Sequence, residues 1–205
     1  MTENKSVVRP AVVGFLILTL ITGVIYTFVC TGIGQLLFNH KANGSMITGT
    51  SNGQEVQYGS EFLAQPFTDP KYLIGRPWND GTPTNLNPVG DEQEALVQER
   101  IDWWHGLDPE NSADIPMELV TVGGSGYDPE ITPAGAEYQV ARIARERGIS
   151  EEKVREIITA NTKDRAFGVL GEPTVNVLKV NLALDGIETE YSSMIVLRDR
   201  GSSIL

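Results

Sequence analysis

The sequence predicts a single N-terminal transmembrane helix followed by one α/β (α+β) extracytoplasmic domain. The first observation is an apolar run, residues 11–38, in a stretch that has no Asp, Glu, Lys or Arg between Arg9 and Lys41. As a helix rising about 1.5 Å per residue, this run exceeds the roughly 30 Å hydrocarbon core of a bilayer. The second observation is the mixture of helix and strand patterns in residues 61–185, which predicts one soluble domain.

The apolar run is too long for the hydrophobic region of a signal peptide, which usually holds about 7–15 residues. We therefore expect a retained anchor in a lipid bilayer. Lys5 and Arg9 lie in the preceding tail, residues 1–10, whereas Lys41 alone follows the run closely. Because basic residues are in excess on the cytoplasmic side of membrane helices, the flanks predict a cytoplasmic N-terminus and an extracytoplasmic C-terminal domain.

One face of the anchor is expected to pack against another helix. Small side chains let helices approach closely in lipid, where close packing drives association. Gly and Thr are also common in membrane helices, so a face that touches only lipid is the alternative interpretation. The small residues of this face recur at spacings of three or four and are Thr19, Gly23, Thr27, Cys30 and Gly34.

After the anchor, residues 39–60 are expected to form a polar linker and a first strand near Glu55–Tyr58. Residues 61–90 are rich in Pro, Gly, Asn and Asp, a composition typical of a long loop. Aromatic residues are interleaved with these polar residues, and they favour an ordered, packed loop. These aromatic residues are Phe62, Phe67, Tyr72 and Trp78.

Three helices are expected in the rest of the domain. The first begins at Asp91 and ends near His105, because apolar residues recur there at helical spacing. The second begins with Thr132 as its N-cap and ends at Gly148, and the third is capped by Ser150.

Two further strands are expected, over residues 117–122 and 174–184. The second of them shows the period-two alternation of a half-buried strand. Residues 186–205 are interpreted as a polar C-terminal extension.

Composition and charge exclude several classes of function. The chain has one cysteine, so it forms no intrachain disulfide and no Cys-based zinc site. Residues 39–205 hold 14 basic and 26 acidic residues, a net charge of -12. A domain this acidic is poorly suited to neutralise phosphates. We therefore expect no nucleic-acid partner, and we assign no metal-binding residue.

The turn Gly123–Gly126 is the motif that most suggests enzyme chemistry. It is not a nucleophile elbow, because Tyr127 stands where the second glycine belongs. It is not a phosphate-binding P-loop, because no Gly-Lys-Ser/Thr follows. We therefore assign no catalytic residue and expect a subunit or binding module. A free-standing membrane-tethered extracytoplasmic binding or sensor module, with residues 61–90 as its ligand site, and a tethered hydrolase are the alternatives.

Three stretches of the chain carry a resemblance to a known family, and they are Leu119–Pro133, Ala136–Arg142 and Leu170–Asp185. Together they resemble the KdpC family, which belongs to the Kdp-type bacterial potassium-transporting P-type ATPase. The anchor, Gly44-Ser45, the Gly75-Arg76-Pro77 loop and Thr84-Asn85-Leu86 fit this family in the same order. The resemblance covers residues 7–185.

This resemblance implies a non-catalytic, single-pass subunit of a high-affinity, ATP-driven potassium uptake complex in the cell inner (plasma) membrane. The implied partners are a potassium-binding channel-like subunit, a P-type ATPase catalytic subunit and a very small single-helix subunit. The chain is implied to aid assembly and stability and to lie near the potassium entrance. An acidic domain suits that place, because a negative potential raises the local concentration of cations.

The resemblance also implies a nucleotide role, as a catalytic chaperone that raises ATP affinity. The candidate residues for contact with a nucleotide or with another subunit are Gln139 and the turn residues Gly124, Ser125 and Gly126. Gln139 and Arg142 are expected on one helix face, three positions apart. ATP is cytoplasmic, whereas the flanking charges predict that Gln139 is outside. We therefore expect this face to dock on the channel-like subunit, no firmly bound cofactor, and ATP only through the complex.

Overall fold

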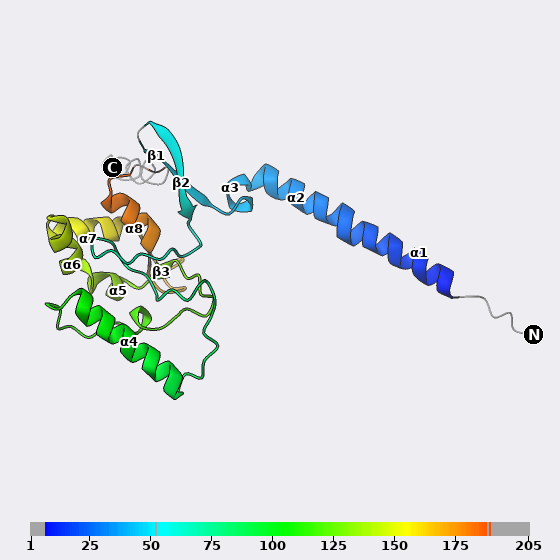
Figure 1. Ribbon diagram of the computed structural model, residues 1–205. Coiled ribbons are helices and arrows are strands. Elements are labelled where there is room, and N and C mark those ends of the chain that lie inside the picture. The colour runs from blue at the N-terminus through cyan, green and yellow to red at the C-terminus, as the bar shows by residue number, and fades with distance from the viewer. Residues whose placement is uncertain (1–6, 52, 188, 190–205) are drawn as a thin grey trace, which may run out of the picture. The chain divides into compact units, whose positions relative to one another are not determined.

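The computed structural model describes residues 7–51, 53–187 and 189. The chain divides into two compact units, Met1–Ser45 and Met46–Leu205 (Figure 1). Most of the predicted N-terminal tail and nearly all of the predicted extension 186–205 lie outside the described residues.

The first unit is a long apolar helix. It consists of α1 (Val8–Thr19), a π-helical segment (Leu20–Ile25) and α2 (Tyr26–Leu37), after which comes the short α3 (Asn39–Ala42). The most apolar window of the stretch Val8–Leu37 has a mean hydropathy of 2.4, and none of the residues in that window is buried within the chain. A helix that is apolar on all sides requires an apolar environment. The expected N-terminal apolar helix is confirmed, and it is long enough to cross a membrane.

The π-helical segment lies in the middle of the small-residue face. Tyr26 N–H donates to Ile21 O, five residues back, and such a turn holds more residues than the 3.6 of an α-helical turn. Residues four apart, such as Thr19, Gly23 and Thr27, therefore stay closer to one face than they would in an uninterrupted α-helix. Among the described residues, a Cβ atom added at Gly23 would meet only Thr19 Cγ2, at 4.0 Å.

The second unit begins with an antiparallel hairpin of β1 (Met46–Ser51) and β2 (Gln54–Ser60). The strand expected near residues 55–58 is confirmed and is longer than predicted. The polar linker expected before it is wrong in part, because α3 and β1 occupy most of that stretch. The prediction missed β1 because the strand is mostly polar, and Ile47 is the hydrophobic side chain that it buries.

A short three-stranded antiparallel sheet follows, in the order β3 (Glu130–Ile131), β5 (Thr174–Asn176), β4 (Thr162–Lys163). Helices pack around this sheet, and α4 lies on the opposite side of the unit from the hairpin (Figure 1). The second unit is therefore a mixed helix and sheet domain, as expected. Its helices are α4 (Asp91–Leu107), α5 (Pro133–Glu137), α6 (Val140–Arg147), α7 (Glu151–Ala160) and α8 (Val177–Leu184).

The helix ends follow the predicted capping signals. Thr132 Oγ1 accepts from Gly135 N at 3.1 Å, and Ser150 Oγ accepts from Lys153 N at 3.2 Å. Gly148 has φ +64°, the left-handed conformation that ends many helices. The single helix expected over residues 132–148 is instead two helices, because the chain turns at residues 138–139 between α5 and α6.

The loop expected over residues 61–90 is confirmed, and it is packed. It has no regular helix or strand, yet Leu73 and Ile74 are buried and the rings of Phe67 and Tyr72 lie 5.4 Å apart. Phe62 differs from this expectation because it is exposed, and Trp78 is exposed in part although its ring lies against that of Tyr127. The loop shares one hydrophobic core with the helices and the sheet. The fully buried apolar side chains of this core include Leu73, Ile131, Val140, Ile143, Val154, Val175 and Val180.

The strand expected over residues 117–122 is wrong. The segment contains a 3₁₀ turn, Met117–Leu119, followed by irregular chain. The carbonyl oxygens of Leu119 and Val120 accept from Trp104 Nε1 and Arg100 Nη1, each at 2.9 Å. Side chains of α4 therefore take the place that a neighbouring strand would fill.

The strand expected over residues 174–184 is correct for β5 only, because α8 follows directly. Asn176 Oδ1 accepts from Lys179 N at 3.0 Å and so caps the helix. The apolar residues also fit a helix, since Val177 and Val180 contact the main core while Leu178 and Leu182 pack on Ile47. A segment buried on two sides has no clear polar face, so its alternation misled the prediction.

Asn176→Ala is expected to destabilise the domain more than Ser150→Ala. Each change removes an N-cap, which costs about 1 kcal/mol. Asn176 also donates from Nδ2 to Glu61 O at 2.9 Å, and losing that bond adds roughly another 1 kcal/mol. Urea unfolding of the full chain in mild detergent, followed by tryptophan fluorescence, measures both free energies of unfolding. Equal values for the two variants would contradict the second role of Asn176.

Candidate functional site

Three buried polar side chains, Gln139, Arg142 and Asn181, form what we call the polar clamp. Gln139 lies between α5 and α6 and is fully buried. Its Oε1 accepts from Ile74 N at 2.8 Å, and its Nε2 donates to Ile74 O at 2.9 Å and to Gly135 O at 3.1 Å. The side-chain amide thus pairs with a loop residue as a neighbouring strand would.

Arg142 extends the clamp one turn further along α6. Its Nη2 donates to Gln139 Oε1 at 2.7 Å, and its Nη1 donates to Tyr72 O at 3.2 Å and to Pro70 O. Burial lowers the pKa of Arg142 to about 10, while the nearby charge of Asp108 opposes this shift. The guanidinium therefore stays charged at neutral pH, and the carbonyl oxygens of the loop offset its loss of hydration.

Asn181 completes the clamp from α8. Its Oδ1 accepts from Leu73 N at 2.8 Å, and its Nδ2 donates to Leu73 O at 2.9 Å. The two amides hold both backbone groups of Leu73 and Ile74, and Arg142 holds the carbonyls just before them. Because unpaired backbone groups are costly inside a protein, this pairing is what lets an irregular loop run through the core.

The predicted shared face of Gln139 and Arg142 is present, because the two side chains bond directly across one helical turn. That face points inward, and both residues are 0% exposed. In this structure neither a nucleotide nor a partner chain can reach the Gln139 side chain. A direct contact role for Gln139 stays a prediction that this geometry does not support.

The predicted turn residues lie at another place on the domain. Gly126 has φ +75°, and a Cβ atom there would lie 2.6 Å from Thr82 N. Ser125 Oγ accepts from Tyr127 N at 3.1 Å, a contact that shapes the turn. Gly124 faces open space. The turn therefore packs on the loop at residues 79–82, and the fold does not join it to Gln139 in one exposed site.

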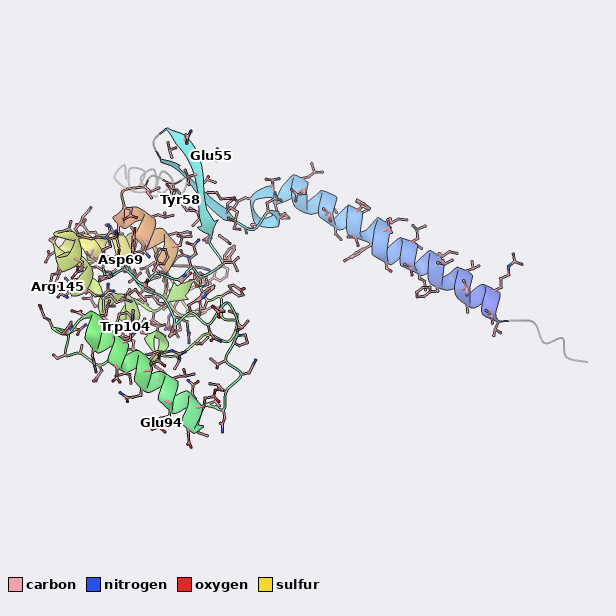
Figure 2. The ribbon with its side chains drawn as sticks, in the orientation of Figure 1. Glu55, Tyr58, Asp69, Glu94, Trp104 and Arg145 are labelled. Carbon is pink, nitrogen blue, oxygen red and sulfur yellow. The ribbon has the colours of Figure 1, made fainter. Side chains whose placement is uncertain are left out.

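A pocket that the sequence analysis did not predict lies beside the clamped loop. We call it the Arg–Trp pocket; its volume is about 260 Å³, and its walls come from residues 65–68, residues 74–78, α4 and Leu119. Trp104 lies on the α4 face that is turned toward the rest of the domain (Figure 2). The pocket's charged and aromatic walls include Phe67, Arg76, Trp78, Arg100, Trp103 and Trp104.

Two sequence signals pointed toward this pocket. Arg76 belongs to the Gly-Arg-Pro loop that fits the family resemblance, and Arg100 and Trp103 lie three positions apart on a predicted helix, so they share a face. The pairing of the loop with the helix was not predictable, because it depends on how the polar clamp places residues 74–78. Among the described residues, no group of three or more His, Cys, Asp or Glu side chains lies together as a metal site.

In the part of the chain that the structure describes, one helix is long and apolar enough to cross a membrane, and an α+β domain follows it. These two features define the class of a membrane-associated protein. Its sequence matches the KdpC family model, "K+-transporting ATPase, c chain", over residues 8–186. This chain belongs to the KdpC family.

Similar proteins come from several bacteria. The potassium-transporting ATPase KdpC subunit of Listeria innocua serovar 6a is 57% identical over 189 residues, covering 92% of this chain and 100% of the relative. The KdpC subunit of Sorangium cellulosum is 46% identical, covering 87% of this chain and 96% of the relative. That of Clostridium botulinum is also 46% identical, covering 91% of this chain and 99% of the relative.

Gln139→Ala is expected to lower the free energy of unfolding by about 3 kcal/mol, because it leaves buried groups of Ile74 and Arg142 without a partner. Urea unfolding of the full chain in mild detergent measures the loss. Gln98→Ala is the matched control: Gln98 is exposed on α4 and bonds only to Asp102 among the described residues, at 2.8 Å. The control is expected to lose less than about 0.5 kcal/mol. Equal losses would contradict the structural role of Gln139.

Proposed function

We propose that this chain is an accessory, non-catalytic subunit of a high-affinity, ATP-driven potassium uptake complex. The observation that carries the proposal is the match to the KdpC family over residues 8–186, with relatives named as subunits of a potassium-transporting ATPase. The chain aids assembly and stability of a channel-like potassium-binding subunit and a P-type ATPase catalytic subunit. A very small single-helix subunit is the third proposed protein partner.

The apolar helix supplies the proposed assembly contact within the bilayer. Its small-residue face is open within the first unit, and the π-helical segment helps to align that face. Small residues on a membrane helix allow close approach of a partner helix. The face proposed for this contact consists of Thr19, Gly23, Thr27, Cys30 and Gly34.

The proposed orientation places the N-terminus in the cytoplasm and the α+β domain outside the inner membrane. It rests on Lys5 and Arg9 before the helix, against Lys41 alone just after it. In this orientation the net charge of -12 in residues 39–205 faces the side from which potassium enters. A negative potential raises the local cation concentration there, and salt weakens the effect.

The same orientation separates the domain from cytoplasmic ATP. We infer that ATP is bound only by the catalytic partner and that any effect of this chain on ATP affinity passes through its contacts with other subunits. The burial of Gln139 supports this view. A free-standing binding or sensor module is the alternative function, and it differs in requiring no partner subunits.

Purification of the tagged chain in mild detergent tests the proposal. Channel-like and ATPase subunits are expected to co-purify in fixed proportion, whereas a chain that purifies alone would support the free-standing module. Gly23→Leu adds bulk to the small-residue face, and we expect recovery of the partners to fall on the order of tenfold, equivalent to about 1.4 kcal/mol. Insertion should persist, because Leu is favourable in the bilayer.

Gly14→Leu is the matched control for this change. Gly14 lies on α1 away from the small-residue face, and no described atom lies within 4 Å of its added Cβ atom. The control is expected to recover the partners as fully as the unchanged chain. Full recovery with Gly23→Leu as well would show that the small-residue face touches lipid.

Cysteine labelling tests the orientation. In a Cys30→Ser background, Thr159→Cys on the exposed side of α7 is expected to react with a membrane-impermeant thiol reagent in intact cells. Ser6→Cys, in the tail that precedes the apolar helix in the sequence, is expected to react only after lysis. The reverse pattern would overturn the orientation and would place the α+β domain on the same side of the membrane as ATP.

A further inference from the structure

The Arg–Trp pocket combines positive charge with apolar walls in a domain that is otherwise strongly acidic. Arg76 and Arg100 are its charged residues, and none of its described lining residues is acidic. Trp78 and Trp103 are each about two-fifths exposed, at 39% and 42%, so both rings are accessible at the protein surface. Such a combination fits an anion with an apolar body rather than a cation.

Among the residues that the structure describes, the two guanidinium groups have few acceptors at short distance. Arg76 forms an ion pair with Asp128 Oδ2 at 3.5 Å and contacts Thr121 Oγ1 at 3.5 Å, and both distances are at the outer limit of a hydrogen bond. Its buried Nε has no acceptor among the described residues. Arg100 donates to the Val120 carbonyl at 2.9 Å. A guanidinium has five N–H donors, so both groups retain capacity for a ligand.

Burial lowers the pKa of Arg100, and the charge of Glu99 opposes the shift. A lowered pKa means that the Arg100 guanidinium has lost part of its hydration and that no nearby negative charge fully compensates this loss. A bound carboxylate would supply that missing interaction, because a guanidinium pairs with a carboxylate through two parallel hydrogen bonds.

We propose that the Arg–Trp pocket binds a small free carboxylate that has an aromatic body. The carboxylate pairs with Arg76 and Arg100, and the aromatic ring lies against Phe67, Trp78 and Trp103. A volume of about 260 Å³ is below the range of roughly 300–1,000 Å³ for drug-sized ligands, so the ligand is small. The polar clamp holds Ile74, so the loop that forms one wall of the pocket is anchored directly before residues 75–78.

Ligand-observed fluorine NMR on the full chain in zwitterionic lipid nanodiscs tests the proposal. The probe is 4-(trifluoromethyl)phenylacetate, and its uncharged counterpart is 4-(trifluoromethyl)phenylacetamide. The carboxylate signal is expected to broaden with the chain and not with empty nanodiscs. The amide is expected to bind on the order of tenfold more weakly, and equal binding of the two probes would overturn the proposal.

Two variants and a matched control locate the site. Arg76→Gln and Arg100→Gln are each expected to weaken carboxylate binding on the order of tenfold, while thermal unfolding checks that they remain folded. Arg165→Gln is the control, because Arg165 pairs on the surface with Glu172 at 2.6 Å and is not among the pocket's walls. Equal binding by the control and the two pocket variants would place the probe elsewhere and overturn the proposal.

The intact complex distinguishes a free ligand from an acidic side chain of a partner. If the pocket serves a free carboxylate, the probe binds the chain alone and the purified complex with similar affinity. Binding to the chain alone, with none to the complex, would mean that a partner fills the pocket and would overturn the free-ligand proposal. Because the nanodisc measurement uses the chain by itself, its failure is distinguishable from a failure of assembly with the other subunits.

Discussion

The guanidinium of Arg142 lies inside the domain, and much of the surrounding structure depends on how its charge is accommodated. An isolated buried charge is very costly, and a buried cation persists only where acceptors replace its water. Gln139 Oε1 and the carbonyls of Pro70 and Tyr72 are those acceptors, and the ring of Trp104 lies 5.8 Å from the guanidinium carbon. The loop must pass beside α6 for the Nη1 and Nη2 groups to be paired, so the polar clamp selects one path for the chain.

That path explains why a long segment without helix or strand is ordered. Gln139 and Asn181 pair with both backbone groups of two consecutive residues, Ile74 and Leu73. The two side-chain amides therefore supply the hydrogen bonds that neighbouring strands would otherwise give to the loop. Arg76 and Trp78 follow at once, which places them against α4. The pocket thus results from the same hydrogen bonds that hold the core together.

The sequence predicted those features that local chemistry determines. The apolar helix, the caps at Thr132 and Ser150, and the left-handed end at Gly148 each depend on residues a few positions apart. The strand errors occurred where distant side chains decide the backbone conformation. Residues 117–122 lost strand pairing to α4, and the segment after Asn176 is a helix buried on two sides. Gln139 was predicted as a contact residue for a nucleotide or another subunit, and that role stays a prediction. Burial cannot be read from one sequence, and in the structure the Gln139 amide pairs with backbone groups inside the domain.

The placement of the arginines also affects the electrostatics of the surface. Arg142 is buried, Arg147 donates to the carbonyls of Lys71 and Leu184, and Arg145 pairs with Asp108 at 2.7 Å. These three arginines are bonded to groups of the domain itself. Carboxylates therefore dominate the charge that the domain presents to solvent. This distribution favours cations near the domain and opposes the approach of anions. The ligand proposed for the Arg–Trp pocket must cross that field to reach the two guanidinium groups. Added salt therefore weakens two interactions of the ligand, its repulsion by the acidic surface during approach and its attraction to the two guanidinium groups at the site. Salt screens the partly buried contact less than it screens the exposed surface.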